Sequence, residues 1–271
     1  MKAIVWQITY RCNNKCPYCT IFGKYKGEPD IAYDLWLNAF NRLKPRIIDI
    51  TGGEPFLYKD LIPLINGLNK SIEIGLTTNL TQDITQFVQK VNPSRILSMT
   101  LSYHPSMSMQ KDYFIGKALL LLQRGFPINV NFVGYPEQMY MIPTLKYTFE
   151  SAGIKFHVDP YAQHEGKQYE FNDFEQAFLK KMVGNDREFR FKETEGVVKC
   201  SAGSDYLVIL PDGTAHRCMH FNLTGRKAIG NILDPTMKLY DEWQLCDQMN
   251  QCGGCDKDKT QMIEVKDGIL T

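Results

Sequence analysis

The sequence predicts an α/β fold in which six parallel strands and their helices form an open or partial TIM-like barrel, followed by a small α+β module. Three observations lead to this prediction. Apolar runs alternate with helical patterns six times, several of these runs carry polar residues at every second position, and the pattern changes after Asp159. Strands joined by helices in this way pair in parallel through right-handed crossovers, which curves the sheet towards a barrel.

Each predicted strand ends at a polar or glycine-bearing turn, as the strands of βα units do. The strands are predicted at Lys2–Thr9, Arg46–Thr51, Ser71–Thr77, Arg95–Ser102, Pro127–Val133 and Gly153–Val158. Between them, apolar residues recur at spacings of three and four, which predicts helices. These helical segments read YDLWLNAFNRL, KDLIPLINGL, QDITQFVQKV, KALLLLQRG and MIPTLKYTFE.

Polar residues share one face of several predicted strands, although parallel strands between helical layers are normally apolar throughout. They are Glu73, Thr77 and Asn79, then Ser98, Thr100, Ser102 and His104, then Asn129 and Asn131, and finally His157 and Asp159. We therefore expect a polar cavity inside the barrel. The alternative is that these side chains only satisfy one another and some buried water.

The second half of the chain is predicted to hold a helix, a hairpin and a second helix. NDFEQAFLKKMV predicts a helix with an Asn or Asp cap. DYLVILPDGTAHRC predicts a hairpin that turns at Pro-Asp-Gly, and a last helix is predicted near Pro235–Met249. We expect a barrel domain over residues 1–165, a bridging helix and linker over 166–199, and a hairpin-and-helix domain over 200–271.

Composition and charge exclude several classes of partner. The 31 Lys and Arg residues nearly balance the 30 Asp and Glu residues, so no excess of positive charge favours nucleic acid or an anionic membrane. Apolar runs such as ALLLL, at residues 118–122, are far shorter than the roughly 18 residues that a membrane span needs. The start of the chain is too short and too polar for a signal peptide. We expect a cytoplasmic protein, of an oligomeric state that the sequence does not predict.

Three thiols lie close together in CNNKCPYC, at Cys12, Cys16 and Cys19, directly after the first predicted strand. Clustered thiols in a reducing compartment are more often metal ligands or catalytic groups than disulfides. Structural zinc takes four ligands, whereas an iron–sulfur cubane held by three thiolates keeps one iron open for an external ligand. The loop also lies at the end of the barrel where βα folds do their chemistry.

CNNKCPYC resembles the cluster motif of the radical S-adenosylmethionine enzymes, with Tyr18 as the aromatic residue before the last cysteine. TGGEP, at residues 51–55, strengthens this resemblance because it ends the second strand, although GGEP alone is more often a tight turn that starts a helix. By this resemblance Gly52, Gly53 and Glu54 hold the amino group of S-adenosylmethionine. The resemblance implies reductive cleavage of that cofactor to a 5'-deoxyadenosyl radical, which removes a hydrogen atom from the substrate.

The resemblance also implies further cofactor contacts and a protein partner. Polar groups at the ends of the third and fourth strands are expected to contact the ribose and the carboxylate of S-adenosylmethionine. The candidates are Thr78, Asn79 and Ser102, with Asn131 as a fainter one. A flavodoxin or a ferredoxin is the expected electron donor.

A second set of thiols frames the hairpin and the last predicted helix, at Cys200, Cys218, Cys252 and Cys255. Four thiols in this arrangement could be a zinc staple. CSAGSDYLVILPDGTAHRC and AIGNI, however, resemble the Twitch extension, a short SPASM-like domain in which such cysteines hold an auxiliary 4Fe-4S cluster. The resemblance therefore implies two 4Fe-4S clusters and S-adenosylmethionine as cofactors.

One cysteine, Cys246, is left over on the last predicted helix. It shares a stripe with Leu239 and Trp243, which predicts a small buried core residue. It could also donate a hydrogen atom to a product radical, as in radical epimerases, or replace one of the four ligands.

An auxiliary cluster with four protein ligands favours electron transfer, and therefore an oxidation of the substrate. The base that such a reaction needs could be His104, Asp159 or His164. A polar cavity favours a sugar, cyclitol or nucleoside over a lipid. A peptide substrate is less expected because the first strand begins at Lys2, and a molybdenum-cofactor cyclase is less expected because the chain ends in KDGILT. A zinc-stapled binding protein without enzymatic activity is the alternative from another class.

Overall fold

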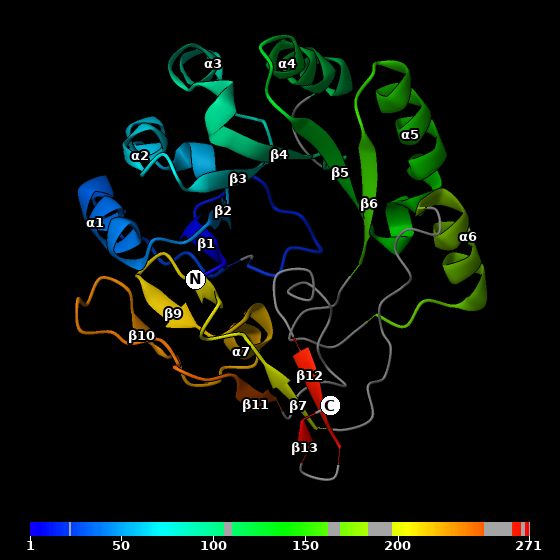
Figure 1. Cartoon of the computed structure of the whole chain (residues 1–271). Coiled ribbons are helices and arrows are strands. Elements are labelled where there is room, and N and C mark those ends of the chain that lie inside the picture. The colour runs from blue at the N-terminus through cyan, green and yellow to red at the C-terminus, as the bar shows by residue number, and fades with distance from the viewer. Residues whose placement is uncertain are drawn as a thin grey trace.

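The computed structural model describes residues 1–21, 23–105, 110–161, 169–183, 197–246, 262–266 and 269–270. Its main sheet has nine strands in the order β10-β9-β8-β1-β2-β3-β4-β5-β6. The parallel strands β1 to β6 confirm the predicted half barrel, and the sheet curves around a central space (Figure 1). They are β1 (Ala3–Thr9), β2 (Ile47–Gly52), β3 (Glu73–Thr78), β4 (Ile96–Ser102), β5 (Ile128–Gly134) and β6 (Phe156–Pro160).

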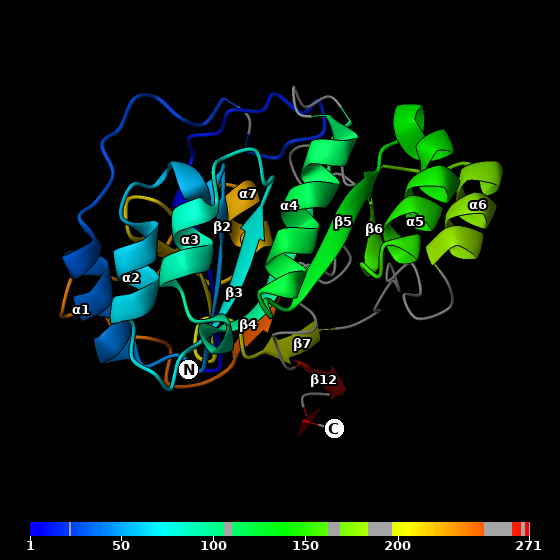
Figure 2. The ribbon, with the colours of Figure 1, turned by 90° about the horizontal axis from the view of Figure 1, so that it is seen from above.

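Helices cover the outer face of this curved sheet (Figure 1 and Figure 2). They are α1 (Tyr33–Leu43), α2 (Leu61–Gly67), α3 (Thr85–Lys90), α4 (Lys111–Gln123) and α5 (Ile142–Ser151), with the short 3-10 helices η1 (Pro55–Leu57), η2 (Pro93–Arg95) and η3 (Pro136–Met141) between them. The core lies between the sheet and these helices because both present apolar side chains there. In one part of it, the ring of Trp6 on β1 lies 4.7 Å from Trp36 and 4.8 Å from Phe40, both on α1.

The helix predicted after the barrel is present as α6 (Asp173–Val183). Asn172 caps it, since its side-chain oxygen accepts a hydrogen bond from the backbone N–H of Glu175 at 2.9 Å. The Glu175 carboxylate accepts from the N–H of Asn172 at 2.9 Å in return. This reciprocal pair is a capping box, and it explains why the helix begins where the sequence predicts.

The predicted hairpin forms and extends the barrel sheet. Its strands are β8 (Tyr206–Ile209) and β9 (Thr214–His216), and β8 pairs in parallel with β1, with Tyr206 opposite Ala3. The short strand β10 (Gly230–Asn231) follows on the far side of β9. A short helix, α7 (Met219–Leu223), lies between β9 and β10 in the chain. The domain boundaries at residues 165 and 200 stay predictions, but one sheet runs across both.

The helix predicted near Pro235–Met249 is wrong for the part of that segment that the structure describes. Residues 244–246 instead form β11 (Gln244–Cys246), which pairs with β7 (Val197–Cys200) in a second sheet of order β11-β7-β12-β13. Tertiary contacts override the helical pattern here. The N–H of Tyr240 bonds the carbonyl of Gly203 at 3.1 Å, and the Tyr240 ring fills the space that a side chain at position 203 would need. The remaining strands are β12 (Met262–Lys266) and β13 (Ile269–Leu270).

Within the described ranges, none of the helices has both the length and the apolar character needed to cross a bilayer.

Candidate active site

The carboxyl ends of β1 to β5 surround a cavity of about 300 Å³, which we call the upper cavity. Ten of the predicted site residues line it, from the two short motifs, from the ends of the third and fourth strands and from the candidate bases. They are Cys12, Cys16, Tyr18, Cys19, Gly52, Gly53, Thr78, Asn79, Ser102 and His104. Segments far apart in the sequence thus meet at one place, which is the end of the barrel where the sequence predicts chemistry.

The three N-terminal thiols are the predicted ligands of an iron–sulfur cluster with one open iron. Cys12 is exposed, Cys19 is half-buried and Cys16 is buried, and the N–H of Cys19 bonds the carbonyl of Cys16 at 3.1 Å. Among the described residues, no three Cys, His, Asp or Glu side chains converge as the ligands of a single metal ion would. Three local thiols are one fewer than the four ligands of structural zinc, and they match in number the thiolates of a cluster that leaves one iron open.

Two amide groups approach the sulfur of Cys12. The backbone N–H of Asn14 lies 3.4 Å from Cys12 Sγ, and the side-chain nitrogen of Asn79 lies 3.8 Å from it. Burial raises the pKa of the Cys12 thiol, and the hydrogen bond from Asn14 lowers it. Donors of this kind stabilise a thiolate, and hydrogen bonds to cluster sulfurs tune reduction potentials.

The glycine pair brings the cysteine segment close to β2. A Cβ atom at Gly53 would lie 2.0 Å from the carbonyl oxygen of Arg11, and one at Gly52 would lie 2.4 Å from that of Thr9. Gly52 also has φ +131, which side chains rarely allow. The N–H groups of Gly53 and Glu54 then bond Thr9 O at 2.7 Å and Arg11 O at 2.8 Å. Glycine is needed at both positions because the backbone that leads to the thiols packs directly against them.

Glu54 lies behind the wall of the upper cavity and is fully buried. One carboxylate oxygen accepts from the hydroxyl of Thr78 at 2.7 Å and from the N–H of Phe56 at 3.0 Å. The other accepts from the N–H of Asn79 at 2.7 Å. Burial raises the pKa of the Glu54 carboxyl, against the lowering effect of these hydrogen bonds. The side chain thereby ties the end of β2 to the end of β3.

Lys117, on α4, holds the loop at residues 80–82, which directly follows Asn79. Its side chain is buried, and its ammonium donates to the carbonyls of Leu80, Thr81 and Gln82 at 3.1, 3.3 and 2.7 Å. Burial lowers the pKa of this lysine. The sequence prediction missed Lys117, but an isolated lysine at the start of the apolar segment KALLLLQRG was the available signal.

Tyr18 and His104 form a pair at the rim of the upper cavity. The Tyr18 hydroxyl lies 2.8 Å from His104 Nδ1, and burial raises the pKa of Tyr18. Burial also lowers the pKa of His104 to about 4, so its ring is neutral at pH 7. In the tautomer that carries its proton on Nε2, a neutral ring accepts the hydrogen bond of the Tyr18 hydroxyl at Nδ1. This contact suits the positioning of Tyr18 better than the role of a strong base.

Among the described residues of the C-terminal half, Met219 lines the upper cavity. Met219 begins α7 directly after Cys218, and its sulfur lies 3.7 Å from the side-chain nitrogen of Gln7 on β1. The sequence prediction missed Met219 because no motif includes it. Its place beside a predicted cluster cysteine was the available signal.

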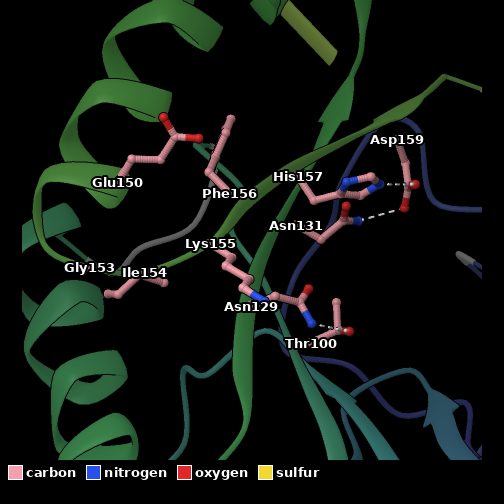
Figure 3. A pocket seen from close by; sticks show the side chains of 10 residues that line it. All are labelled: Thr100, Asn129, Asn131, Glu150, Gly153, Ile154, Lys155, Phe156, His157 and Asp159. Carbon is pink, nitrogen blue, oxygen red and sulfur yellow. Dashed lines mark hydrogen bonds and ion pairs between the residues drawn. The ribbon is translucent and has the colours of Figure 1, made fainter. Parts of the chain in front are cut away.

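Asn131 and Asp159 do not line the upper cavity. They line a second cavity, of about 790 Å³, which we call the lower cavity (Figure 3). Thr100, Asn129 and His157 line it too, so the predicted polar face of β4, β5 and β6 does border a cavity. The sequence prediction placed His157 on this face but did not select it as a candidate.

The second set of thiols is described in part. Cys200 is buried on β7, and Cys218 and Cys246 pack against the same small apolar cluster, which includes Val5 and Tyr206. Cys246 lies on β11 and therefore not on the predicted helix. Three further candidates, Cys252, Cys255 and His164, lie outside the described residues.

Residues 6–100 match the family model described as Radical SAM superfamily. Two curated relatives match over 82 residues each. A probable GTP 3',8-cyclase of Methanopyrus kandleri is 34% identical, over 29% of this chain and 27% of the relative. A PqqA peptide cyclase of Rhodopseudomonas palustris is 33% identical, over 29% of this chain and 21% of the relative. The chain thus spans about a quarter of the length of these relatives.

Solved structures share the fold over most of the chain. SuiB of Streptococcus suis, in a structure with bound S-adenosylmethionine, has a TM-score of 0.65 at 18% identity, over 87% of this chain and 64% of SuiB. Native anSMEcpe with bound AdoMet has a TM-score of 0.63 at 15% identity, over 87% of this chain and 79% of anSMEcpe. Residues 6–100 are thus similar to the Radical SAM superfamily, and the chain has the fold of these solved structures.

Proposed function

We propose that this chain is an enzyme that cleaves S-adenosylmethionine reductively and uses the resulting radical on a polar substrate. One observation carries the proposal: the cysteine triplet, the glycine pair and the polar ends of β3 and β4 line the same cavity. The match of residues 6–100, which include most of these residues, to the Radical SAM superfamily supports it as well.

The proposed cofactor site uses residues of the upper cavity. Cys12, Cys16 and Cys19 hold a 4Fe-4S cluster, which with bound S-adenosylmethionine supplies a 5'-deoxyadenosyl radical. Thr78 and Ser102 offer hydroxyl groups at the edge of the same cavity. Glu54 acts indirectly in this proposal, because its oxygens are occupied by Phe56, Thr78 and Asn79.

An auxiliary 4Fe-4S cluster in a Twitch domain is the second part of the proposal. Cys200 and Cys218 pack against the same small cluster of residues, which supports a shared site, and Cys252 and Cys255 would complete the ligand set. The proposed reaction is an oxidation: the substrate loses a hydrogen atom to the radical, a proton to a base and one electron to the auxiliary cluster. A flavodoxin or a ferredoxin would supply the electron that starts the cycle.

The substrate we propose is a polar small molecule of the sugar, cyclitol or nucleoside class. The polar lining of the lower cavity supports this class. A peptide substrate is the second candidate. SuiB was also solved with its precursor peptide SuiA, and anSMEcpe with the Cp18Cys peptide, and both have this fold.

The test of the cofactor site is anaerobic reconstitution followed by reduction with dithionite. We expect about eight irons per chain with labile sulfide, and slow release of methionine and 5'-deoxyadenosine even without a substrate. Replacing Cys12, Cys16 and Cys19 together by Ala should abolish this cleavage and leave about four irons. Zinc without labile sulfide, or no cleavage by the wild-type protein, would contradict the proposal and favour a zinc-stapled binding protein.

A reaction in deuterated water distinguishes oxidation from epimerisation once a substrate is found. An oxidised product that is unaffected by Cys246→Ala supports the proposal. Solvent deuterium in a stereoinverted product, lost in Cys246→Ala, would instead assign Cys246 as a hydrogen donor.

A further inference from the structure

The lower cavity lies at the open edge of the barrel, against β6, which is the last strand of the main sheet. Its inner wall consists of polar side chains from β4, β5 and β6, and Figure 3 shows Asn131, His157 and Asp159 turned towards one another. Its rim comes from the end of α5 and the turn before β6, with Glu150 and Lys155. A small molecule could enter from this rim and meet the polar wall.

Residues that line the two cavities are paired neighbours on adjacent strands. Ser102 of the upper cavity pairs with Asn131, and Asn131 pairs with His157. Val133 of the upper cavity pairs with Asp159 in the same way. Because neighbouring strands lie about 4.8 Å apart, an occupant of the lower cavity lies one or two strands from the cofactor site. Direct transfer of a hydrogen atom requires that kind of proximity.

The inner wall is only partly paired. Asn131 Nδ2 donates to Asp159 Oδ2 at 2.8 Å, and His157 Nε2 lies 3.3 Å from Asp159 Oδ1. Asn131 Oδ1 and His157 Nε2 are nevertheless buried without a hydrogen bond of ordinary geometry. A buried polar group without a partner carries a free-energy cost. A ligand that draws these side chains into new hydrogen bonds would recover part of that cost.

Hydrogen-bond acceptors dominate this wall. Among the described lining residues, two carry carboxylates: Asp159 on the inner wall, and Glu150 at the rim, where it pairs with Lys146 at 2.9 Å. The side-chain oxygens of Asn129, Asn131 and Thr100 add further acceptors. A ligand that presents hydroxyl and ammonium donors complements such a wall, whereas an anionic ligand would be repelled by Asp159.

We propose that the lower cavity is the substrate site and that it takes a small molecule bearing both hydroxyl and amino groups, with the ammonium on Asp159. The inference rests on the proposed function for its chemistry, but the binding site can be tested separately. His157 and Asn131 hold the Asp159 carboxylate in place, and Thr100 and Asn129 contact hydroxyl groups.

The binding test uses three probes that differ mainly in charge: glucosamine, glucose and gluconate. Saturation-transfer NMR on the reconstituted protein should rank them in that order, with glucosamine at least tenfold tighter than gluconate. Asp159→Asn should weaken glucosamine at least tenfold and should not weaken glucose by more than twofold. Asp173→Asn, an exposed change on α6, should leave all three affinities within twofold of the wild type.

Each other outcome overturns the inference. It is wrong if gluconate binds as tightly as glucosamine, if no probe binds, or if Asp159→Asn leaves the preference for glucosamine unchanged. Cleavage of S-adenosylmethionine by the wild-type protein is measured in parallel without a probe. Cleavage without the charge preference would contradict only this inference, and the charge preference without cleavage would contradict only the proposed function.

Discussion

The two cavities differ in what holds their polar linings. Behind the wall of the upper cavity, the buried oxygens of Glu54 accept three hydrogen bonds and the ammonium of Lys117 donates three. In the lower cavity, lining side chains bond one another, as Asn131 does Asp159. Among the described residues, both linings keep two buried polar atoms without a hydrogen bond, on Gln7 and Asn14 in the upper cavity and on Asn131 and His157 in the lower one. A rigid scaffold behind the upper cavity suits a constant cofactor, and a lining that can exchange partners suits a selected substrate.

The largest loss of stability is expected from Glu54→Gln, behind the wall of the upper cavity. The amide keeps one acceptor oxygen but turns a donor towards the N–H of Phe56 or Asn79, so a buried N–H loses its partner. We expect a loss of about 2 to 4 kcal/mol in the free energy of unfolding and much weaker binding of S-adenosylmethionine. Urea unfolding measures the first effect. Glu73→Gln, at an exposed ion pair with Arg46, is the matched control and should change the stability by less than about 0.5 kcal/mol.

The next effect is expected from Lys117→Met, which leaves three carbonyls without their charged donor. We expect a loss of about 2 kcal/mol and faster hydrogen exchange in the loop at residues 79–82. Lys111→Met, at an exposed position on the same helix, is the control. If Lys111→Met and Lys117→Met change stability and hydrogen exchange equally, Lys117 does not fix the loop. The upper cavity would then lack part of the scaffold that distinguishes it from the lower one.

A third test uses pH. The folded-state pKa of His104 is lowered to about 4, below its unfolded value near 6.5, so its contribution to stability is present above pH 6.5 and is lost as the pH falls towards 4. We expect this group to remove about 1 to 2 kcal/mol between pH 7 and pH 5. His104→Gln keeps an acceptor for Tyr18 and should flatten this part of the pH dependence. If the free energy of unfolding falls as steeply with falling pH in His104→Gln as in the wild type, the lowered pKa of His104 is wrong.

The smallest effect is expected from Cys246→Ala. Cys246 is half-buried on the short strand β11, so the free energy of unfolding should fall by less than about 1 kcal/mol. Iron content should stay at the wild-type level, whereas Cys218→Ala should lower it by about half. A loss of iron in Cys246→Ala would make Cys246 a ligand and would remove one of the four proposed ones.

The sequence was sufficient for the barrel because its signals are local. YDLWLNAFNRL matches α1 residue for residue, and the six predicted strands all form. The cysteine and glycine motifs also located the upper cavity, because strand ends in a parallel barrel must meet. The strand β11 could not be predicted, since its pairing with β7 is a contact between distant segments. Lys117 was missed because its carbonyl partners are 35 to 37 residues away in the chain, and Met219 because no motif includes it.

The pairing of β8 with β1 has a consequence for how the chain folds. The first strand is made at the start of synthesis, but its outer edge is not covered until residues 206–209 are available more than 190 residues later. Until then an apolar strand presents unpaired N–H and C=O groups, which is the usual starting point for edge-to-edge aggregation. In a chain shortened before β8, the outer edge of β1 would therefore stay unpaired. Such a barrel would be prone to aggregate through that edge.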